Sequence, residues 1–202
     1  MKKAILLIAL AFPVLVSAQD TKKLQTAFEQ SYAYEAKYNY KAAISGLKAV
    51  YSETNYELNL RLGWLSYLDS NQTASLSYYQ KAVNLMPNAI EPKFGIVYPL
   101  SVMAKWDEVV KQYDAILKTD PGQTTALYRL GLIYYNRGQF EKAKSFFDKF
   151  LGLYPFDYDA VMMSAWASLM LNNNSDAKKL FNRAMLISPG DKMALEGLSM
   201  VK

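Results

Sequence analysis

Cysteine and histidine are both absent from this sequence of 202 residues. Without them the chain can form no disulfide, no thiolate or imidazole metal site, no cysteine nucleophile and no Ser-His-Asp triad, because each needs a side chain that is missing. The remaining carboxylates fall in no recognisable catalytic or metal-binding motif. The composition therefore predicts a protein that is not an enzyme and that uses no metal ion or cofactor.

The rest of the composition is that of a folded globular domain. Apolar residues make up 51% of the chain and charged residues 20%, which is enough apolar surface for a core. The formal net charge is +5, and it falls to 5 − 2 = +3 when the two lysines of the leader described next are removed. Lysines and glutamates are interspersed elsewhere without a basic cluster, so we expect no nucleic-acid partner.

The first eighteen residues have the pattern of a secretory signal peptide. Lys2 and Lys3 precede an apolar run over residues 4–16, and the small residue Ala18 follows shortly after. The run has 16 − 4 + 1 = 13 residues, fewer than the roughly 20 that cross a bilayer. Gln19 stands where a lipoprotein would carry its lipid-bearing cysteine. We therefore expect export, cleavage after Ala18, and a mature protein without a transmembrane segment in the periplasm or outside a bacterial cell.

A fixed sequence period organises the remainder of the chain. Prolines recur at an interval of 121 − 87 = 34 positions, and an aromatic residue precedes each of them by eight places. The two series are Pro87, Pro121, Pro155 and Pro189, and Tyr79, Tyr113, Phe147 and Phe181. Within each unit the apolar residues recur twice at helical spacing around a short polar break. Each repeat is therefore predicted to be a pair of antiparallel helices.

The unit at residues 124–157 carries the repeated motif most clearly. It comprises Leu127, Leu130, Gly131 and Tyr134, then Gly138, then Ala143 and Phe147, and finally Pro155. This pattern resembles the tetratricopeptide repeat. The resemblance implies that the paired helices approach closely at the glycine and the alanine, that aromatic side chains fill the space between hairpins, and that first helices line a concave face.

The resemblance covers residues 19–202, which we expect to form a single all-α domain. That domain would be a right-handed superhelical solenoid of about five helix-turn-helix hairpins. The repeats are predicted at 24–55, 56–89, 90–123, 124–157 and 158–190, followed by a capping helix at 191–202 that could also mediate self-association. Helices are predicted over 20–37, 40–52, 55–69, 72–86, 89–104, 106–118, 122–136, 139–153, 157–171, 174–187 and 191–201.

Two repeats depart from the pattern. The first has Ser31 where glycine is usual, lacks the closing proline and precedes the next repeat by only 56 − 24 = 32 positions, as befits a capping repeat. In the third, Phe94-Gly95-x-x-Tyr98 falls two places early relative to Pro121, and Pro99 lies within the helix. A shifted or kinked hairpin is expected there.

A second apolar stripe runs along the first helices, rotated by about 100° from the face that packs within each hairpin. It consists of Phe28 and Tyr32; Leu60, Trp64 and Tyr67; Phe94 and Tyr98 in the unshifted register; Tyr128, Leu132 and Tyr135; and Met162, Trp166 and Leu169. The stripe could be buried between adjacent first helices as part of the core. It could instead line a groove that binds a partner, because exposed aromatic surfaces usually mark binding sites.

Arg61 and Arg129 each precede a Leu-Gly pair and are predicted at the edge of this surface. There they could pair with acidic groups on a ligand or simply be solvated. Trp106 is predicted at the start of a helix on the convex side, away from the groove.

The apolar stripe favours an extended apolar peptide or an amphipathic helix over a terminal carboxylate clamped by lysines. We therefore expect a non-enzymatic scaffold for protein partners in the bacterial cell envelope. A soluble glycan-binding protein is the alternative, because sugar faces also stack on tryptophan and tyrosine. An enzyme is disfavoured, because Asp148, Asp157 and Asp159 are expected to cap helices or lie on exposed faces.

Overall fold

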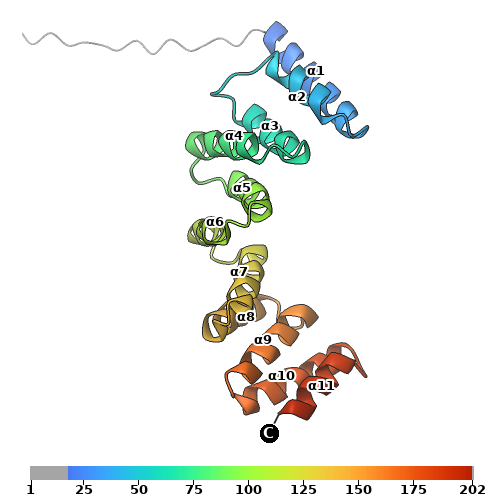
Figure 1. Cartoon of the computed structure of the whole chain (residues 1–202), viewed down its shortest axis with the longest axis vertical. Helices are drawn as coiled ribbons and strands as arrows, with labels where there is room; N and C mark the ends of the chain where they lie inside the picture. The colour runs from blue at the N-terminus through green and yellow to red at the C-terminus, as the bar shows by residue number, and fades with distance from the viewer. Residues whose placement is uncertain (1–17, 202) are drawn as a thin grey trace, which may run out of the picture.

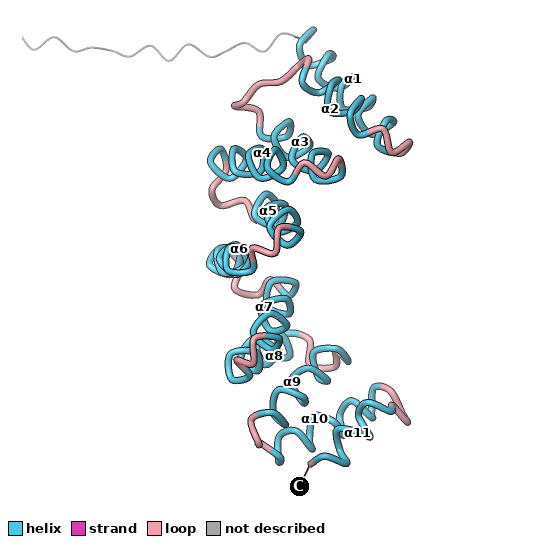
Figure 2. Tube along the Cα trace, in the orientation of Figure 1, coloured by secondary structure: helices cyan, strands magenta, loops and turns pink. Residues whose placement is uncertain are grey.

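A computed structural model describes residues 18–201, so the predicted signal segment lies outside the described residues except for Ala18. Over this range the chain forms helices and the turns between them, without a strand (Figure 2). The helices are α1 (Ala18–Glu35), α2 (Tyr40–Lys48), α3 (Tyr56–Leu68), α4 (Gln72–Leu85), α5 (Glu91–Val102), α6 (Trp106–Thr119), α7 (Thr124–Asn136), α8 (Phe140–Leu153), α9 (Tyr158–Met170), α10 (Asn174–Ile187) and α11 (Lys192–Met200).

The predicted helices are all present, and their ends agree to within a single helical turn or so. The largest difference is at α2, which ends at Lys48 instead of residue 52. There the backbone N–H groups of Val50 and Tyr51 donate to carbonyls only three places back, at 3.2 and 3.3 Å. Such bonds belong to a tighter turn than the α-helix, so the helix closes early.

Each hairpin turns through one residue in the left-handed region. These residues are Tyr38, Ser70, Ala104, Gly138 and Asn172, with φ of 57°, 59°, 55°, 69° and 57°. The polar residue that follows often caps the second helix. Asn39, Asn71 and Asn173 each accept a hydrogen bond through the side chain from the backbone N–H three places on. The polar breaks in the sequence are therefore both the turns and the caps.

The hairpins stack into an elongated, curved array (Figure 1). In this view α3, α5 and α7 lie on the inner side of the curve, and α4, α6 and α8 lie on the outer side. Neighbouring first helices also contact each other directly, α3 with α5 and α7 with α9. The architecture is the predicted all-α solenoid.

Aromatic rings of the second helices fill the core where first helices carry small residues. Phe147 and Phe181 are fully buried, and Tyr79 is only 5% exposed. A Cβ on Gly131 would lie 2.5 Å from Cε1 of Phe147, which is closer than side-chain atoms can approach. The glycine in the motif is thus required by the packing of the ring.

The third repeat keeps the period of the others, so the expected shift is wrong. Helix α5 runs without interruption through Pro99 and ends at Val102, one period before the end of α7 at Asn136. Its buried positions include Ile96, Val97 and Leu100, which match the packing face of α7. Pro99 has no N–H to donate to the carbonyl of Gly95 four places back, so α5 continues through it with one intrahelical hydrogen bond fewer.

Helix α11 covers the end of the last hairpin, as predicted. Gly197 is buried, and a Cβ there would clash with the ring of Phe181. Its outer face leaves Met193, Leu195 and Met200 about half exposed, at 53%, 48% and 53%. Among residues 18–201, we find no helix that is both long and apolar enough to cross a membrane.

Candidate binding groove

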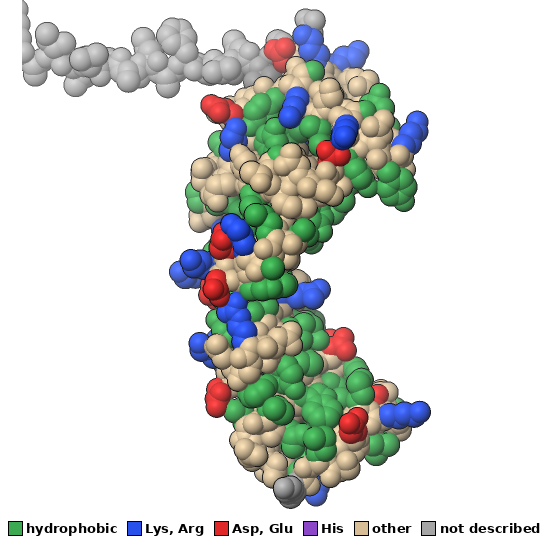
Figure 3. Space-filling view, in the orientation of Figure 1, with side chains coloured by type: hydrophobic (Ala, Val, Ile, Leu, Met, Phe, Trp, Pro, Cys, Tyr) green, Lys and Arg blue, Asp and Glu red, His purple; other side chains and the backbone are tan. Residues whose placement is uncertain are grey.

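Three hollows follow one another along the first helices, and hydrophobic side chains gather along the inner side of the curve (Figure 3). The first hollow lies among α1, α3 and α5 and has a volume of about 760 Å³. The second involves α5, α6 and α7 and has a volume of about 450 Å³. The third involves α7, α8 and α9 and measures about 230 Å³.

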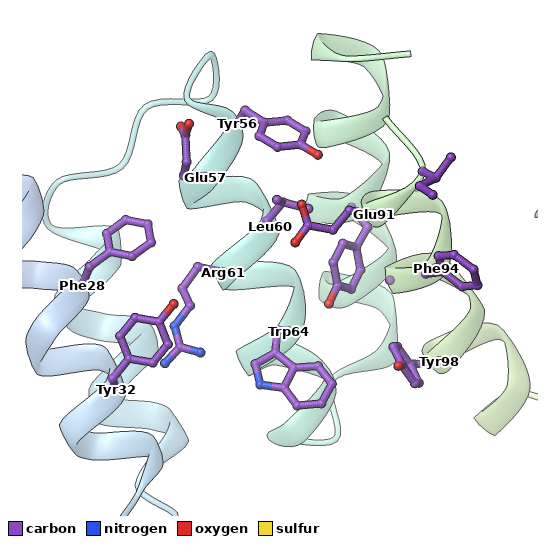
Figure 4. Close-up of a pocket in the computed structure, with 13 residues that line it drawn as sticks. Phe28, Tyr32, Tyr56, Glu57, Leu60, Arg61, Trp64, Glu91, Phe94 and Tyr98 are labelled. Atoms are coloured by element: carbon purple, nitrogen blue, oxygen red, sulfur yellow. The ribbon is translucent and has the colours of Figure 1, made fainter. Parts of the chain in front are cut away.

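The first hollow brings together seven of the predicted site residues, from three successive first helices (Figure 4). Those seven are Phe28, Tyr32, Leu60, Arg61, Trp64, Phe94 and Tyr98. The hollow also has lining residues that the sequence analysis did not assign to the site, which are Tyr56, Glu57, Tyr79, Ile90, Glu91 and Gly95. A ligand that fills the first hollow could therefore contact three repeats at once.

Aromatic rings dominate the wall of the first hollow at α3 and α5. Trp64, Tyr67 and Tyr98 form a cluster in which the three ring centroids are 5.4 to 5.8 Å apart. Tyr98 remains 47% exposed, and Tyr32 on the opposite wall is 57% exposed. The other rings of the predicted stripe in this region are half-buried. Tyr32, Trp64 and Tyr98 thus pack on one side and face the hollow on the other, whereas Tyr67 packs on Trp64 and Tyr98 without lining the hollow.

Arg61 lies inside the wall instead of at the edge of the groove, which corrects its predicted position. Only 7% of it is exposed, and its Nη1 forms an ion pair with Glu35 at 2.5 Å. Its Nε donates to the hydroxyl of Ser31 at 3.0 Å, and the Tyr32 ring lies 3.8 Å from its Cζ. The serine that departs from the repeat motif thus provides an acceptor that glycine would lack. Nη2 is buried without a hydrogen-bond partner among residues 18–201.

Glu35 joins Arg61 to the ring cluster. The indole Nε1 of Trp64 donates to Oε1 of Glu35 at 2.7 Å, while Oε2 of the same carboxylate faces Arg61. One carboxylate on α1 thus satisfies two side chains on α3. The positive charge of Arg61 is neutralised within the protein and is not free for an acidic ligand.

Two further carboxylates line the first hollow, Glu57 and Glu91, and both are exposed. Burial raises the pKa of the Tyr56 hydroxyl, and the charge of Glu91 and a hydrogen bond to it raise this pKa further. Burial also raises the pKa of Tyr79 far above its ordinary value. Both phenols therefore stay protonated near neutral pH. The sequence signal for the two carboxylates was their separation of one period, 91 − 57 = 34.

The second hollow contains Phe94, Tyr98, Arg129 and Leu132 of the predicted site. Arg129 is exposed, in agreement with its predicted place at the edge. Trp106 also lines this hollow and is 47% exposed. Helix α6 begins at Trp106 as predicted. The expectation that this side chain lies away from the groove is wrong, because it lines this hollow together with Leu132 and Asn136 of α7.

The third hollow is lined by Tyr128, Arg129, Asp157 and Asp159, among others. The Tyr128 ring packs against Phe147 and Phe150 at 5.7 and 5.9 Å between centroids. Burial raises the pKa of Tyr128, and the charges of Asp159 and Asp157 add to the effect. Asp157 also caps α9, accepting from the backbone N–H of Ala160 at 2.9 Å, as the sequence suggested for an acid at a helix end.

The stripe residues of the last repeat line none of these three hollows. Met162 is only 4% exposed and belongs to the same buried cluster as Ala194 of α11, so its predicted place in the groove is wrong. Trp166 packs edge-on against Phe181 at 5.0 Å, and Leu169 is half-buried in the same cluster. Helix α11 covers α9 in the way that a following repeat would.

Tyr135 of the predicted stripe lies outside the three hollows as well. It is half-buried and packs on Phe140 of its own hairpin, with 5.2 Å between ring centroids. Burial raises the pKa of its hydroxyl. Its ring therefore contributes to packing more than to the groove.

The groove provides aromatic and carboxylate surface. Over residues 18–201 we find no group of three acidic side chains placed to hold a metal ion. The groove can bind through ring contacts, hydrogen bonds and charge, and its hollows continue from repeat to repeat.

These features define a helical-repeat solenoid with an aromatic groove on its inner face. A family model described as "Tetratricopeptide repeat" matches residues 125–157, the unit in which the sequence motif is clearest. The match shows a tetratricopeptide repeat over these residues, and the stacked hairpins on either side of them share the same fold.

Solved structures with this fold are similar over most of the chain. A tetratricopeptide repeat protein from Parabacteroides merdae has a TM-score of 0.73 and 22% identity, with 89% of this chain and 72% of that one covered. A MamA protein has a TM-score of 0.71 and 18% identity, covering 83% and 92%. MamA from Desulfovibrio magneticus has a TM-score of 0.68 and 17% identity, with 84% of this chain and 97% of that one covered. At these identities the likeness concerns the fold. No curated protein matches the chain.

Proposed function

We propose that this protein is a non-enzymatic scaffold that binds a protein partner in its concave groove. The observation that carries the proposal is the first hollow, where about 760 Å³ of space is walled by aromatic residues from three repeats. Tyr32 and Tyr98 remain about half exposed there. Tyrosine and tryptophan are the residue types that most often anchor protein interfaces, and the fold presents them side by side.

The partner segment would be an extended apolar peptide or one face of an amphipathic helix. Both place side chains at regular intervals, and the three hollows also recur along one face. We expect the first two hollows to be occupied together, because Phe94 and Tyr98 line both of them.

Site-specific photocrosslinking in the producing cell tests this function. A photoreactive phenylalanine at position 98 should yield a covalent adduct with a protein partner. The matched control carries it at Leu186, which is 73% exposed on α10 outside the hollows. Adducts of equal yield and identity at both positions, or none at position 98, would refute binding in the groove.

A glycan-binding protein remains the second candidate, favoured by one observation. The carboxylates of Glu57 and Glu91 lie in the same hollow as the rings, and sugar sites combine rings with such acceptors. A glycan array probed with the purified chain, beside the Tyr98→Ala variant, separates the two functions. Glycan binding that depends on Tyr98 would favour the second candidate.

We further propose that the protein acts in the cell envelope after export. The support is the sequence of residues 1–18, because residues 1–17 lie outside the described residues. Mass spectrometry of the intact protein from the producing cell should give a chain that begins at Gln19. A chain that still begins at Met1 in the soluble fraction would contradict export.

A further inference from the structure

The first hollow has unpaired negative charge in a protein that is positively charged as a whole. Three charged residues line it, namely Glu57, Arg61 and Glu91. Arg61 is already neutralised by Glu35. No lysine or arginine in residues 18–201 forms an ion pair with Glu57 or Glu91. The hollow therefore has two uncompensated carboxylates, although the formal charge of the chain is +5.

The two carboxylates occupy equivalent positions in successive repeats. Glu57 lies in the first turn of α3 and Glu91 in the first turn of α5, one period apart. An acidic residue in a first turn is stabilised by the helix dipole, so this position alone does not require a ligand. Its consequence here is that both charges line the hollow, at the beginnings of the two helices that carry the rings of Trp64 and Tyr98 further along.

Aromatic surface continues from these carboxylates along the same two helices. Trp64 follows Glu57 by 64 − 57 = 7 residues and Tyr98 follows Glu91 by 98 − 91 = 7, which is two helical turns. The two rings are neighbours in one cluster, with centroids 5.8 Å apart, and both line the hollow. Apolar side chains and the aliphatic stem of a basic side chain pack on such surface. The lining thus offers contacts for a basic side chain and for the apolar residues beside it.

A second, independent feature of the hollow calls for a hydrogen-bond acceptor from outside the chain. Nη2 of Arg61 is buried without a partner, although Nε and Nη1 of the same group are both satisfied. The Tyr32 ring covers the guanidinium at 3.8 Å and is itself 57% exposed. Rotation of Tyr32 would uncover this donor, and a peptide carbonyl supplies the acceptor. An isolated cation could not.

We propose that the first hollow selects a partner segment with a lysine or arginine side chain among apolar residues. The basic side chain binds at Glu57 and Glu91, the apolar residues beside it pack on the rings of Trp64 and Tyr98, and a backbone carbonyl of the segment accepts from Arg61. This inference rests on the proposed peptide-binding function and specifies the chemistry of the partner. It is the opposite of the acidic ligand that Arg61 suggests from sequence alone.

Three synthetic peptides test the selection directly. They share an apolar sequence and differ only at a central position, which is lysine, norleucine or glutamate. Binding of each labelled peptide to the mature chain is measured by fluorescence anisotropy. We expect the lysine peptide to bind about tenfold more tightly than the norleucine peptide, equivalent to about 1.4 kcal/mol. Non-specific attraction to a positively charged protein would favour the glutamate peptide, so it cannot imitate this result.

Charge-neutralising variants identify the carboxylates responsible. The double variant Glu57→Gln and Glu91→Gln should abolish the preference for lysine while the norleucine peptide binds as before. The matched control is Glu108→Gln with Glu141→Gln, which changes the charge equally at exposed first-turn positions of α6 and α8. The control should keep the preference, and added salt should weaken it in the wild type.

The failures are distinguishable. If all three peptides bind equally and Tyr98→Ala weakens each of them, the groove binds peptides but the proposed selection is wrong. If the glutamate peptide binds best, the selection is also wrong. If no peptide binds to a chain that shows its full helical spectrum, both this inference and the proposed peptide-binding function are contradicted.

Discussion

The ring of Phe147 lies against the backbone of Gly131, so closely that a Cβ there would fall 2.5 Å from the ring. Tyr79 makes the same contact twice. Its ring lies 2.9 Å from the Cβ position of Gly63 in its own hairpin, and closer still to that of Gly95 in the next one. A single ring therefore packs against two repeats, so it contributes to the packing of each of them.

Replacing Gly131 by alanine should destabilise the fold. The added methyl group must displace Phe147, and overpacking of this kind costs about 1–3 kcal/mol. Chemical denaturation measures the change. The control is Gly152→Ala in α8, where a Cβ meets nothing within 4 Å and alanine should stabilise the helix by about 0.5–1 kcal/mol. Equal effects of the two changes would show that Gly131 is not needed for ring packing.

Exchanging glycine and alanine at the left-handed turn residues should change stability in opposite directions. Ala104 and Gly138 occupy the same place in consecutive hairpins, with φ of 55° and 69°. Ala104→Gly should raise the free energy of unfolding by about 0.5–1 kcal/mol, and Gly138→Ala should lower it by about 1–2 kcal/mol. Thermal melts of both variants check this. Two changes of the same sign would contradict the assigned turn geometry.

The polar cluster between α8 and α10 should make the free energy of unfolding depend on pH in the acid range. Nζ of Lys144 lies 2.6 Å from Asp148 and 2.8 Å from Asp176, which also accepts from Ser168. Burial alone would raise the pKa of Asp176, but the hydrogen bond and charge of Lys144 outweigh it, so this pKa is lowered. For Lys144, burial would lower the pKa, but its bonds to Asp148 and Asp176 raise it.

A carboxyl group with a lowered pKa stabilises the folded state above its unfolded pKa and loses this contribution as the pH falls through the folded value. The free energy of unfolding of the wild type should therefore exceed that of Lys144→Gln by a constant amount near neutral pH. This difference should shrink below about pH 4. Denaturation curves over this range measure it. The control is Lys178→Gln, an exposed residue of α10, for which the difference from wild type should not depend on pH in this way.

Glu35→Gln should destabilise the fold, because it leaves the Arg61 charge buried without its counterion. For a partly exposed partner, the loss is expected at about 2–4 kcal/mol. Arg61→Met together with Glu35→Gln should recover much of it, since the unpaired charge is then gone. A double-mutant cycle gives the coupling energy. Strictly additive losses would mean that the two side chains do not interact.

The aromatic stripe should separate into packing and binding residues. Trp166→Ala should lower the free energy of unfolding by about 2–3 kcal/mol, less than for a fully buried ring, because it packs on Phe181. Tyr98→Ala should cost about 1 kcal/mol or less, since the ring is 47% exposed, and should abolish partner binding. Denaturation and the crosslinking yield test the two effects. A strongly destabilised Tyr98→Ala chain would assign this ring to the core.

The periodic part of the fold was predictable because each hairpin obeys the same local rules. The prolines from Pro87 onward and the aromatic residues before them fixed the repeats and the helices. Helix α5 keeps that period even though its Phe94-Gly95 pair suggested a shift. The pair misled because Gly95 contacts Tyr79 of the preceding hairpin, whereas a motif glycine such as Gly131 faces a ring of its own hairpin.

The site was only partly predictable, since its details depend on contacts between repeats. Arg61 of the second repeat pairs with Glu35 of the first, where the sequence departs from the regular period. No sequence motif therefore predicts the pair. Met162 is buried because α11 packs on α9, which the position of Met162 in its own repeat does not reveal. The side-chain types of a stripe can be read locally, whereas their exposure depends on the next hairpin.

The first hollow is walled by α1, α3 and α5, which belong to three different hairpins. Its width is therefore not a property of any one repeat, and it changes whenever the stack bends. A segment that fills the hollow fixes the curvature around it. By thermodynamic reciprocity, a force or contact that bends the stack must change the affinity of the hollow for that segment. Occupancy of the first hollow and bending of the solenoid are thus coupled. Tension applied along the array should therefore change the affinity of the hollow for its segment.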